Sequence, residues 1–264
     1  MEFINRQEHD AILSSMFEKY KVKCSQSEQM IDIFYKMTNR LLEENEKYNL
    51  TAVRTPEGVI EHHIFDSILP ESLIPQGATV LDVGSGGGFP SLPLATVRPD
   101  LKITALDSTE KKTEYIKATA QILGLQNVSV ICGRAEELCT VSLPKDQRLK
   151  HSEITELAKE NPYREKFDVV IARSVASMPL LSELCVPFLK VGGTFIAMKG
   201  EKALHEAKES ENALYLLGCV QKCQIVKPYD IDPEVNKLFF VTAKRSATPA
   251  KYPRRYNQIK KKTL

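Results

Sequence analysis

The stretch at 79–90, TVLDVGSGGGFP, constrains the fold of this chain more than any other part of the sequence. Residues 79–83 are β-branched or aliphatic apart from one aspartate, which predicts a short buried strand. Four of the next five residues are glycines, and the apolar residues at 92–97 predict a helix. Glycines adopt positive φ and let a ligand approach the backbone closely. Strand, glycine turn and helix in succession predict an α/β sheet with a nucleotide-type site at the carboxyl edge of its strands.

Strands and helices alternate after this turn. Further strands are predicted at 102–107, 128–132, 167–172, 194–198, 223–227 and 238–243, with helices at 110–123, 179–189 and 201–217. The alternation predicts a seven-stranded, mainly parallel, doubly wound α/β sheet. No helix is evident between the last two strands, so we expect them to pair antiparallel at one edge.

Composition divides the chain into three parts. Residues 1–75 predict three helices, at 9–20, 27–47 and 56–69, which form an N-terminal helical cap. Residues 76–245 form the α/β domain. Within it, 142–166 is a polar insertion with a short helix expected near 154–160, and a basic tail at 246–264 ends the chain. We expect the insertion to be a surface feature, with a mobile lid as the alternative.

Positive charge gathers at the C-terminal end. The formal net charge is +2, yet five lysines and three arginines lie between 244 and 264 without an acidic residue. Such a segment is suited to phosphate groups, and the aromatic rings of Tyr252 and Tyr256 are suited to stacking on bases. We therefore expect the tail to bind RNA, although a solvated tail without a partner is the alternative. The candidate contacts are Lys251, Arg254, Arg255, Lys260, Lys261 and Lys262.

Other features of the chain point away from metals and membranes. Six cysteines are scattered without a CxxC pair, no apolar run approaches the roughly 20 residues of a membrane span, and the N-terminus does not resemble a signal peptide. We expect a reduced cytoplasmic protein without a disulfide, a metal or a membrane anchor.

Two histidines and an aspartate need a separate account. On a helix His62 and Asp66 share a face while His63 points elsewhere, which disfavours a metal site. We expect a structural hydrogen-bond cluster between the helical cap and the α/β domain. A substrate-side role together with Asn49 and Thr51 is the alternative.

Two residues narrow the ligand of the glycine turn. Phe89 stands where the GxGxxG pattern of nicotinamide-dependent dehydrogenases requires its third glycine. Asp107 ends the second predicted strand, about 20 residues further on, where a carboxylate accepts hydrogen bonds from both ribose hydroxyls. Together they favour an adenosine-containing ligand. Phe89 in place of glycine favours S-adenosylmethionine over a nicotinamide cofactor as that ligand.

Several short motifs resemble one family of enzymes. They are KYNLT at 47–51, HHIFDS at 62–67, DVGSGGGFP at 82–90, GRAE at 133–136, ARSVA at 172–176, KG at 199–200 and YPRR at 252–255. In this order they resemble the bacterial 16S rRNA guanine-N7 methyltransferases, also called glucose-inhibited division protein B or the RsmG family. The resemblance covers about 30–255. Ser91, Ser174 and the ending YNQIKKKTL depart from the family pattern, and the polar insertion is longer than expected.

The resemblance implies a Rossmann-like class I methyltransferase that uses S-adenosylmethionine to methylate N7 of a guanine, position 527 of the 530 loop, in 16S rRNA. It implies 16S rRNA, in the small ribosomal subunit or its assembly intermediate, as the partner. By position it implies a cofactor site of Gly84, Phe89, Ala135, Glu136 and Arg173, to which the residues themselves add Asp107. Glu136 follows the third strand, where adenine is expected, and Arg173 follows the fourth, beside the transferred methyl group.

The chemistry explains why no catalytic dyad is expected. Guanine N7 carries a lone pair and no proton, so its attack on a sulfonium methyl needs alignment rather than a general base. Arg173 is the single candidate for assisting that alignment. The alternatives are a methyltransferase of another RNA or of a protein, and a non-catalytic RNA-binding protein.

Overall fold

The computed structural model describes residues 3–22, 24, 26–142, 150–173, 175–200, 204–227 and 237–264. The chain forms two compact units. The first contains the described residues of Met1–Ala78, Gly84–Cys132 and Lys227–Asn236, and the second those of Thr79–Val83, Gly133–Val226 and Lys237–Leu264. The three-part division expected from composition stays a prediction.

Seven strands form one sheet in the order β3-β2-β1-β4-β5-β7-β6. Their bounds are β1 Thr79–Val83, β2 Lys102–Asp107, β3 Val128–Cys132, β4 Phe167–Arg173, β5 Leu189–Gly200, β6 Gln224–Val226 and β7 Lys237–Ala243. β1 and β4, β2 and β3, and β4 and β5 pair in parallel, whereas β7 is antiparallel to both β5 and β6. The mainly parallel α/β sheet and its antiparallel edge are therefore confirmed.

Two of the differences from the predicted elements have a clear physical reason. β5 begins at Leu189, before the expected 194, because the register between β4 and β5 shifts where Gly193 lies against Asp168. A Cβ on Gly193 would stand 2.7 Å from the Asp168 carbonyl oxygen, so this approach requires glycine. The prediction of a single helix at 201–217 is wrong over the described part of that range. It is two helices, α10 Leu204–Glu209 and α11 Glu211–Leu216, separated by Ser210, whose hydroxyl donates to Ala207 O at 2.7 Å.

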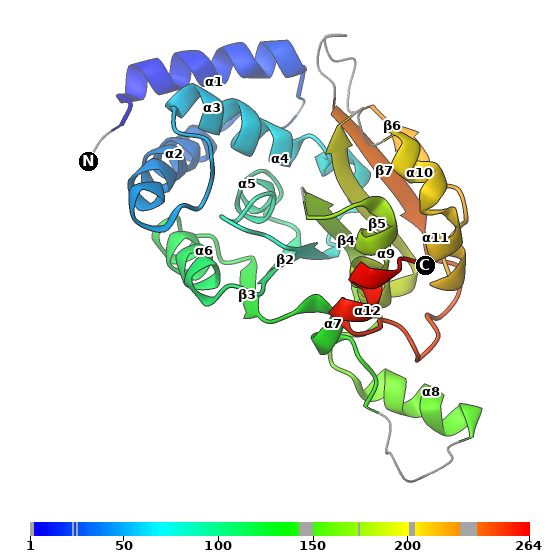
Figure 1. Ribbon diagram of the computed structural model, residues 1–264. Coiled ribbons are helices and arrows are strands. Elements are labelled where there is room, and N and C mark those ends of the chain that lie inside the picture. The colour runs from blue at the N-terminus through cyan, green and yellow to red at the C-terminus, as the bar shows by residue number, and fades with distance from the viewer. Residues whose placement is uncertain are drawn as a thin grey trace. The chain divides into compact units, whose positions relative to one another are not determined.

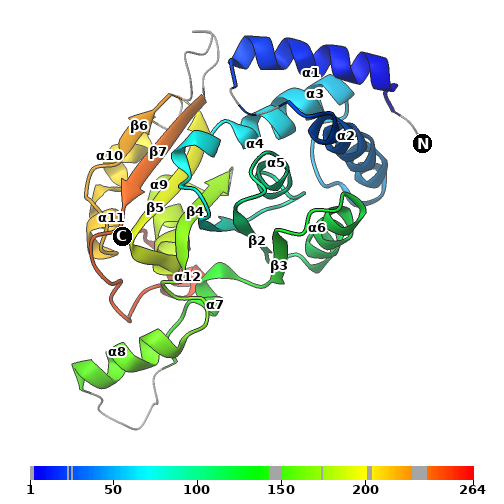
Figure 2. The same ribbon diagram turned by 180° about the vertical axis from the view of Figure 1, so that it is seen from behind.

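The first unit begins with the predicted helices. α1 (Arg6–Tyr20) and α2 (Glu28–Tyr48) are capped by Asn5 and Ser27, whose side chains accept from backbone amides of the first turn. The predicted third helix is continuous but changes pitch, from α3 (Pro56–Val59) through a π-helix η1 (Ile60–Phe65) to α4 (Asp66–Ile68). α1 lies along this third helix in both views (Figures 1 and 2). The buried ring of Phe65 packs between Phe17 and Tyr20, with centroids 4.9 and 5.5 Å away.

The rest of the first unit packs around β2 and β3. A short 3-10 helix η2 (Glu71–Leu73) precedes the sheet, and α5 (Ser91–Val97) and α6 (Glu110–Ile122) follow β1 and β2 in sequence. Arg40 of α2 donates from Nε to Thr119 Oγ1 of α6 at 2.9 Å, and its guanidinium lies over the Tyr115 ring. This contact joins the N-terminal helices to the α/β part of the same unit.

The second unit carries the remaining helices. They are α7 (Ala135–Leu138), α8 (His151–Glu160), α9 (Met178–Cys185), the 3-10 helix η3 (Val186–Phe188), α10, α11 and α12 (Tyr256–Lys261). α8 is the helix expected in the polar insertion, and it projects from the rest of this unit in both views (Figures 1 and 2). Residues 143–149 of the insertion lie outside the described residues.

A carboxylate joins the starts of two central strands in the second unit. Asp168 Oδ2 accepts from the backbone N and the Oγ1 of Thr79 at 2.9 and 2.6 Å, and Lys190 Nζ donates to Oδ1 at 2.8 Å. Burial raises the pKa of Asp168, but the hydrogen bonds from Lys190 and Thr79 outweigh it and lower the pKa from 3.8 to about 2. The carboxylate thus stabilises the pairing of β1 with β4.

We predict that Asp168→Asn lowers the free energy of unfolding at pH 7 by about 1 kcal/mol, because it removes the charge that Lys190 and Thr79 stabilise. The loss stays this small because solvent screens a side chain that is 39% exposed. The folded-state pKa lies below the unfolded one. The ionised carboxylate therefore stabilises the fold above about pH 4, and this contribution is lost as the pH falls toward about 2. Urea unfolding of the wild type and Asp168→Asn across this pH range measures the contribution of the carboxylate. Glu156→Gln on α8 is the control. A difference independent of pH would contradict the assignment.

Candidate functional site

The glycine turn and Asp107 form one hydrogen-bonded arrangement within the first unit. The backbone amides of Gly84 and Ser85 both donate to Leu106 O, at 2.8 and 3.0 Å. Gly86 N donates to Asp107 Oδ2 and Thr109 N to Asp107 Oδ1, both at 2.9 Å. The carboxylate is thereby held in one orientation, and each of its oxygens keeps lone-pair capacity for a ligand hydroxyl. This geometry suits a ribose diol.

The turn has the backbone freedom and the polar atom that a ligand site needs. Gly84, Gly86 and Gly88 have φ values of 75°, 57° and 88°, which glycine adopts without strain. Ser85 Oγ is buried and has no hydrogen-bond partner among the described residues. An orphaned buried hydroxyl is costly unless a ligand or water satisfies it. The unpartnered Ser85 hydroxyl and the Asp107 acceptor therefore fit an adenosine-type cofactor.

Phe89 is tied to the N-terminal helices of the same unit. The buried Asn45 side chain bonds to both the N and O of Thr51, at 2.8 and 3.0 Å, and so shapes the loop after α2. Thr51 Oγ1 lies 2.7 Å from His63 Nε2, and the His63 ring stacks on Phe89 with centroids 4.7 Å apart. His63 therefore serves packing and hydrogen bonding here, which fits the structural interpretation of the histidines.

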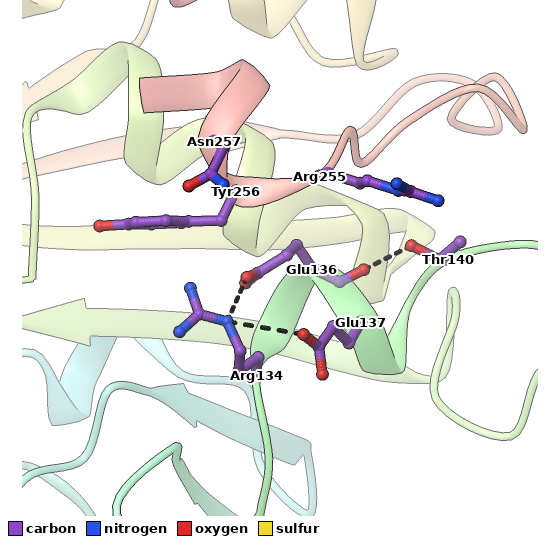
Figure 3. Close-up of a pocket in the computed structure, with 7 residues that line it drawn as sticks. All are labelled: Arg134, Glu136, Glu137, Thr140, Arg255, Tyr256 and Asn257. Carbon is purple, nitrogen blue, oxygen red and sulfur yellow. Dashed lines mark hydrogen bonds and ion pairs between the residues drawn. The ribbon is translucent and has the colours of Figure 1, made fainter. Parts of the chain in front are cut away.

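In the second unit, Ala135 and Glu136 begin α7, and two residues separate Ala135 from the end of β3 at Cys132. Both are buried, and Glu136 Oε1 accepts from Arg134 Nε at 2.6 Å. The Arg134 guanidinium lies over the ring of Tyr256, 4.6 Å from its centroid. Figure 3 shows the Glu136 carboxylate and the Arg134 guanidinium on the same side of that ring. Sequence reasoning identified Glu136 but not this contact with the tail.

Arg173 ends β4, where it pairs in register with Met198 of β5. Ser174 lies outside the described residues. The loop beyond it is held by Lys199, whose Nζ donates to Ala176 O at 2.5 Å and to Glu206 Oε2 at 2.9 Å. Glu206 Oε2 also accepts from Met178 N at 2.8 Å. Sequence reasoning missed Glu206, because nothing in its helical surroundings distinguishes it from a solvated carboxylate.

The basic tail is part of the second unit, and some of the positive charge between 244 and 264 faces inward. Lys244 is buried; its Nζ contacts Glu165 Oε1 at 2.8 Å and donates to the carbonyls of Val186 and Leu189. Burial lowers the pKa of Lys244, while the Glu165 carboxylate opposes this effect. Five positive charges of the tail, in contrast, are exposed: Lys251, Arg255, Lys260, Lys261 and Lys262.

Arg254 differs from the other RNA-binding candidates. Its Nε donates to Glu183 Oε1 at 2.9 Å and its Nη2 to Oε2 at 2.6 Å, while its backbone N also donates to Oε1 at 2.8 Å. The hydrogen bond to Glu183 raises the pKa of Arg254. The Glu183 side chain is fully buried, so Arg254 neutralises an otherwise isolated interior charge.

We predict that Arg254→Ala lowers the free energy of unfolding by about 3–5 kcal/mol, because it leaves the buried Glu183 carboxylate unpaired. The matched control Arg255→Ala removes an exposed arginine and is expected to cost less than about 0.5 kcal/mol. Urea unfolding measures both variants. Equal costs for the two arginines would show that the Glu183 pair does not stabilise the tail.

The described part of the chain shows neither a metal-ligand cluster nor a membrane span. Within it, no group of three or more His, Cys, Asp or Glu side chains has the arrangement of a metal site. No described helix is both long and apolar enough to cross a membrane. All six cysteines are free thiols.

One protein family and several of its members are similar to this chain over most of its length. The family described as rRNA small subunit methyltransferase G (GidB) matches residues 29–228. Ribosomal RNA small subunit methyltransferase G of Alkaliphilus metalliredigens is 38% identical over 228 residues, covering 85% of this chain and 86% of that protein. The proteins of that name from Brevibacillus brevis and Lactobacillus delbrueckii are 38% and 37% identical, covering 89% and 96% of this chain and 90% and 98% of their own lengths. The chain therefore belongs to the rRNA small subunit methyltransferase G family.

Proposed function

We propose that this protein is an S-adenosylmethionine-dependent methyltransferase that methylates N7 of guanine 527 in the 530 loop of 16S rRNA. The observation that carries the proposal is the family match over residues 29–228. The sheet order, with β7 antiparallel in an otherwise parallel set of described pairings, agrees with the Rossmann-like class I fold implied by the sequence resemblance.

Six residues are proposed for the cofactor, and they are named here unit by unit. In the first, Gly84 and Phe89 belong to the glycine turn and Asp107 is the ribose acceptor, supported by its two backbone donors. In the second, Ala135 and Glu136 are proposed for the adenine and Arg173 for the region of the reacting methyl group. The six residues each follow or end a strand whose carboxyl end is the ligand-binding edge of such sheets.

The bound cofactor supplies an electrophilic methyl group on a sulfonium. Guanine N7 has a lone pair and no proton, so this chain needs to orient the two reactants and exclude water rather than move a proton. Lys199 and Glu206 support that task, because they hold the loop that follows Arg173. We assign no general base.

The proposed RNA contacts are the exposed cations Lys251, Arg255, Lys260, Lys261 and Lys262. Arg254 contributes by holding the tail, in view of its pair with Glu183. N7 lies in the deep, narrow major groove of duplex RNA, so the target guanine must be in a loop or be unstacked. We place this reaction in the cytoplasm, with the small ribosomal subunit or an assembly intermediate as the partner.

The function is tested on 16S rRNA and 30S particles from a strain that lacks the corresponding gene. We expect the purified protein and S-adenosylmethionine to restore N7-methylguanosine at position 527, as measured by mass spectrometry of nuclease fragments. Methylation at another site or of a protein would favour the alternatives, and binding without methylation would favour a non-catalytic RNA-binding protein.

For the cofactor site we expect Asp107→Ala to weaken cofactor binding by about 1–3 kcal/mol, because the charge-assisted hydrogen bonds to the ribose disappear. Calorimetry measures the affinity, and Asp10→Asn, at a half-exposed position of α1, is the control. Unchanged affinity in Asp107→Ala would remove this residue from the cofactor site.

Substitution tests the tail better than truncation does, because truncation after Ala243 would also remove the internal partners Lys244 and Arg254. We predict that replacing Lys260, Lys261 and Lys262 together by Gln weakens RNA binding. The slope of log K against log salt should become shallower by about 0.7 for each phosphate that the variant no longer neutralises. The control is Lys159→Gln, an exposed lysine of α8. A slope equal to that of the wild type would exclude these lysines as phosphate ligands.

A further inference from the structure

A cavity of about 520 Å³ lies within the second unit where the start of α7 meets α12 (Figure 3). It is lined by two segments that are far apart in sequence, Arg134, Glu136, Glu137 and Thr140 on one side and Arg255, Tyr256 and Asn257 on the other. This volume lies within the range of small-molecule sites. From the sequence, Glu136 of the first segment is expected to bind the cofactor, and Arg255 and Tyr256 of the second are expected to bind RNA.

Three side chains give the cavity a chemical character. Tyr256 supplies an aromatic face, against which the planar Arg134 guanidinium rests with its carbon 4.6 Å from the ring centroid. Glu136 supplies a carboxylate that is buried to 5% residual exposure. Its Oε1 accepts from Arg134 Nε, and its Oε2 accepts no hydrogen bond from the described residues. An aromatic face beside a buried acceptor fits a planar base that carries an exocyclic amine.

The Arg134 side chain can be displaced from the ring. It is 43% exposed, and an exposed cation–π contact is weaker than the stacking of a base on an aromatic ring. A purine that displaces the guanidinium from the Tyr256 face keeps Glu136 within reach of its amine edge. Arg134 can then turn toward solvent, where Glu137 Oε1 already lies 3.7 Å from its Nε.

We propose that Tyr256 is a positioning residue for the cofactor: its ring packs on the adenine of S-adenosylmethionine and so joins the cofactor to the RNA-binding tail. This inference rests on the proposed function. It extends the adenine site from the residues that follow β3 to the C-terminal helix α12, which also carries Lys260 and Lys261.

A buried guanidinium supports this connection between the tail and the α7 segment. Arg164, at 2% exposure, donates from Nη1 to Cys139 O at the end of α7 and to Tyr252 O in the tail, at 3.0 and 2.7 Å. Its Nη2 donates to Thr248 O at 2.6 Å. One buried cation therefore holds the end of α7, which carries Glu136, to the tail segment that precedes Tyr256. RNA bound at the lysines of α12 is expected to favour the cofactor, and by linkage the cofactor favours RNA.

The experiment measures binding of S-adenosylhomocysteine by calorimetry to wild type, Tyr256→Ala, Tyr256→Leu and Tyr256→Phe. We expect affinity to fall about tenfold in the Ala and Leu variants and to stay within about twofold in Phe, which keeps the aromatic face. Tyr215→Ala is the matched control, because that ring is 67% exposed on α11. In steady-state kinetics the Ala variant should show a raised KM for S-adenosylmethionine and an unchanged kcat.

The link to RNA has its own readout. A 16S rRNA fragment that contains the 530 loop should raise the affinity of wild type for S-adenosylhomocysteine by about threefold or more, and should leave that of Tyr256→Ala unchanged. Melting temperatures within about 2 °C of wild type establish that the variants are folded. If the Tyr256→Ala variant does not fold, the Tyr256→Leu variant is used in its place.

Four outcomes would overturn the proposal. Equal affinity of wild type and both Tyr256→Ala and Tyr256→Leu for S-adenosylhomocysteine removes Tyr256 from the adenine site. Loss of RNA affinity alone in these variants assigns the cavity to an RNA base. An equal effect of RNA on wild type and Tyr256→Ala removes the link to the tail. If the wild-type protein binds no S-adenosylhomocysteine, the proposed function is wrong as well. If, with any of the first three outcomes, the wild-type protein binds the cofactor and methylates the RNA, only the role of Tyr256 is wrong.

Discussion

The C-terminal part of the molecule depends on the buried guanidinium of Arg164. A cation is removed from water there, and the oxygens that accept its hydrogen bonds are backbone carbonyls: those of Cys139, Thr248, Pro249 and Tyr252. Burial accordingly lowers the pKa of Arg164. Such a site is stable only while every acceptor is in place. The α7 segment and the tail are therefore held in one arrangement, although they are far apart in the sequence.

The positive charges between 244 and 264 are of two kinds. Lys244 and Arg254 are paired with Glu165 and Glu183 and stabilise the fold. The lysines at the end of the chain are exposed and available to a polyanion. A formal charge count treats all of them alike, but only the second group is exposed, and we propose that this group binds phosphate. The internal pairs decide where the exposed cations are presented.

Asp107, which we propose as a cofactor residue in the first unit, is held by neutral donors and not by an ion pair. Asp107 is oriented by the backbone amides of Gly86 and Thr109, which need no side-chain cation that would compete with a ribose hydroxyl. Phe89 is supported by His63, which is in turn set by Thr51. The glycine turn thus has a fixed backbone and a supported apolar end. Precise orientation of the reactants is the main requirement for transferring a methyl group to an atom that has no proton to lose.

Local sequence determined the strands β1, β2 and β3 to the residue, the N-cap of α2 and the antiparallel edge, because periodicity, glycines and capping side chains act over a few residues. The motifs also led to the family and to Asp107. Only the tertiary structure decided that Arg254 neutralises Glu183 and that Tyr256 meets Arg134, partners that lie 71 and more than 100 positions apart. A charged residue has the same local signature whether it faces water or a buried partner. Its role is decided by packing that brings distant segments together.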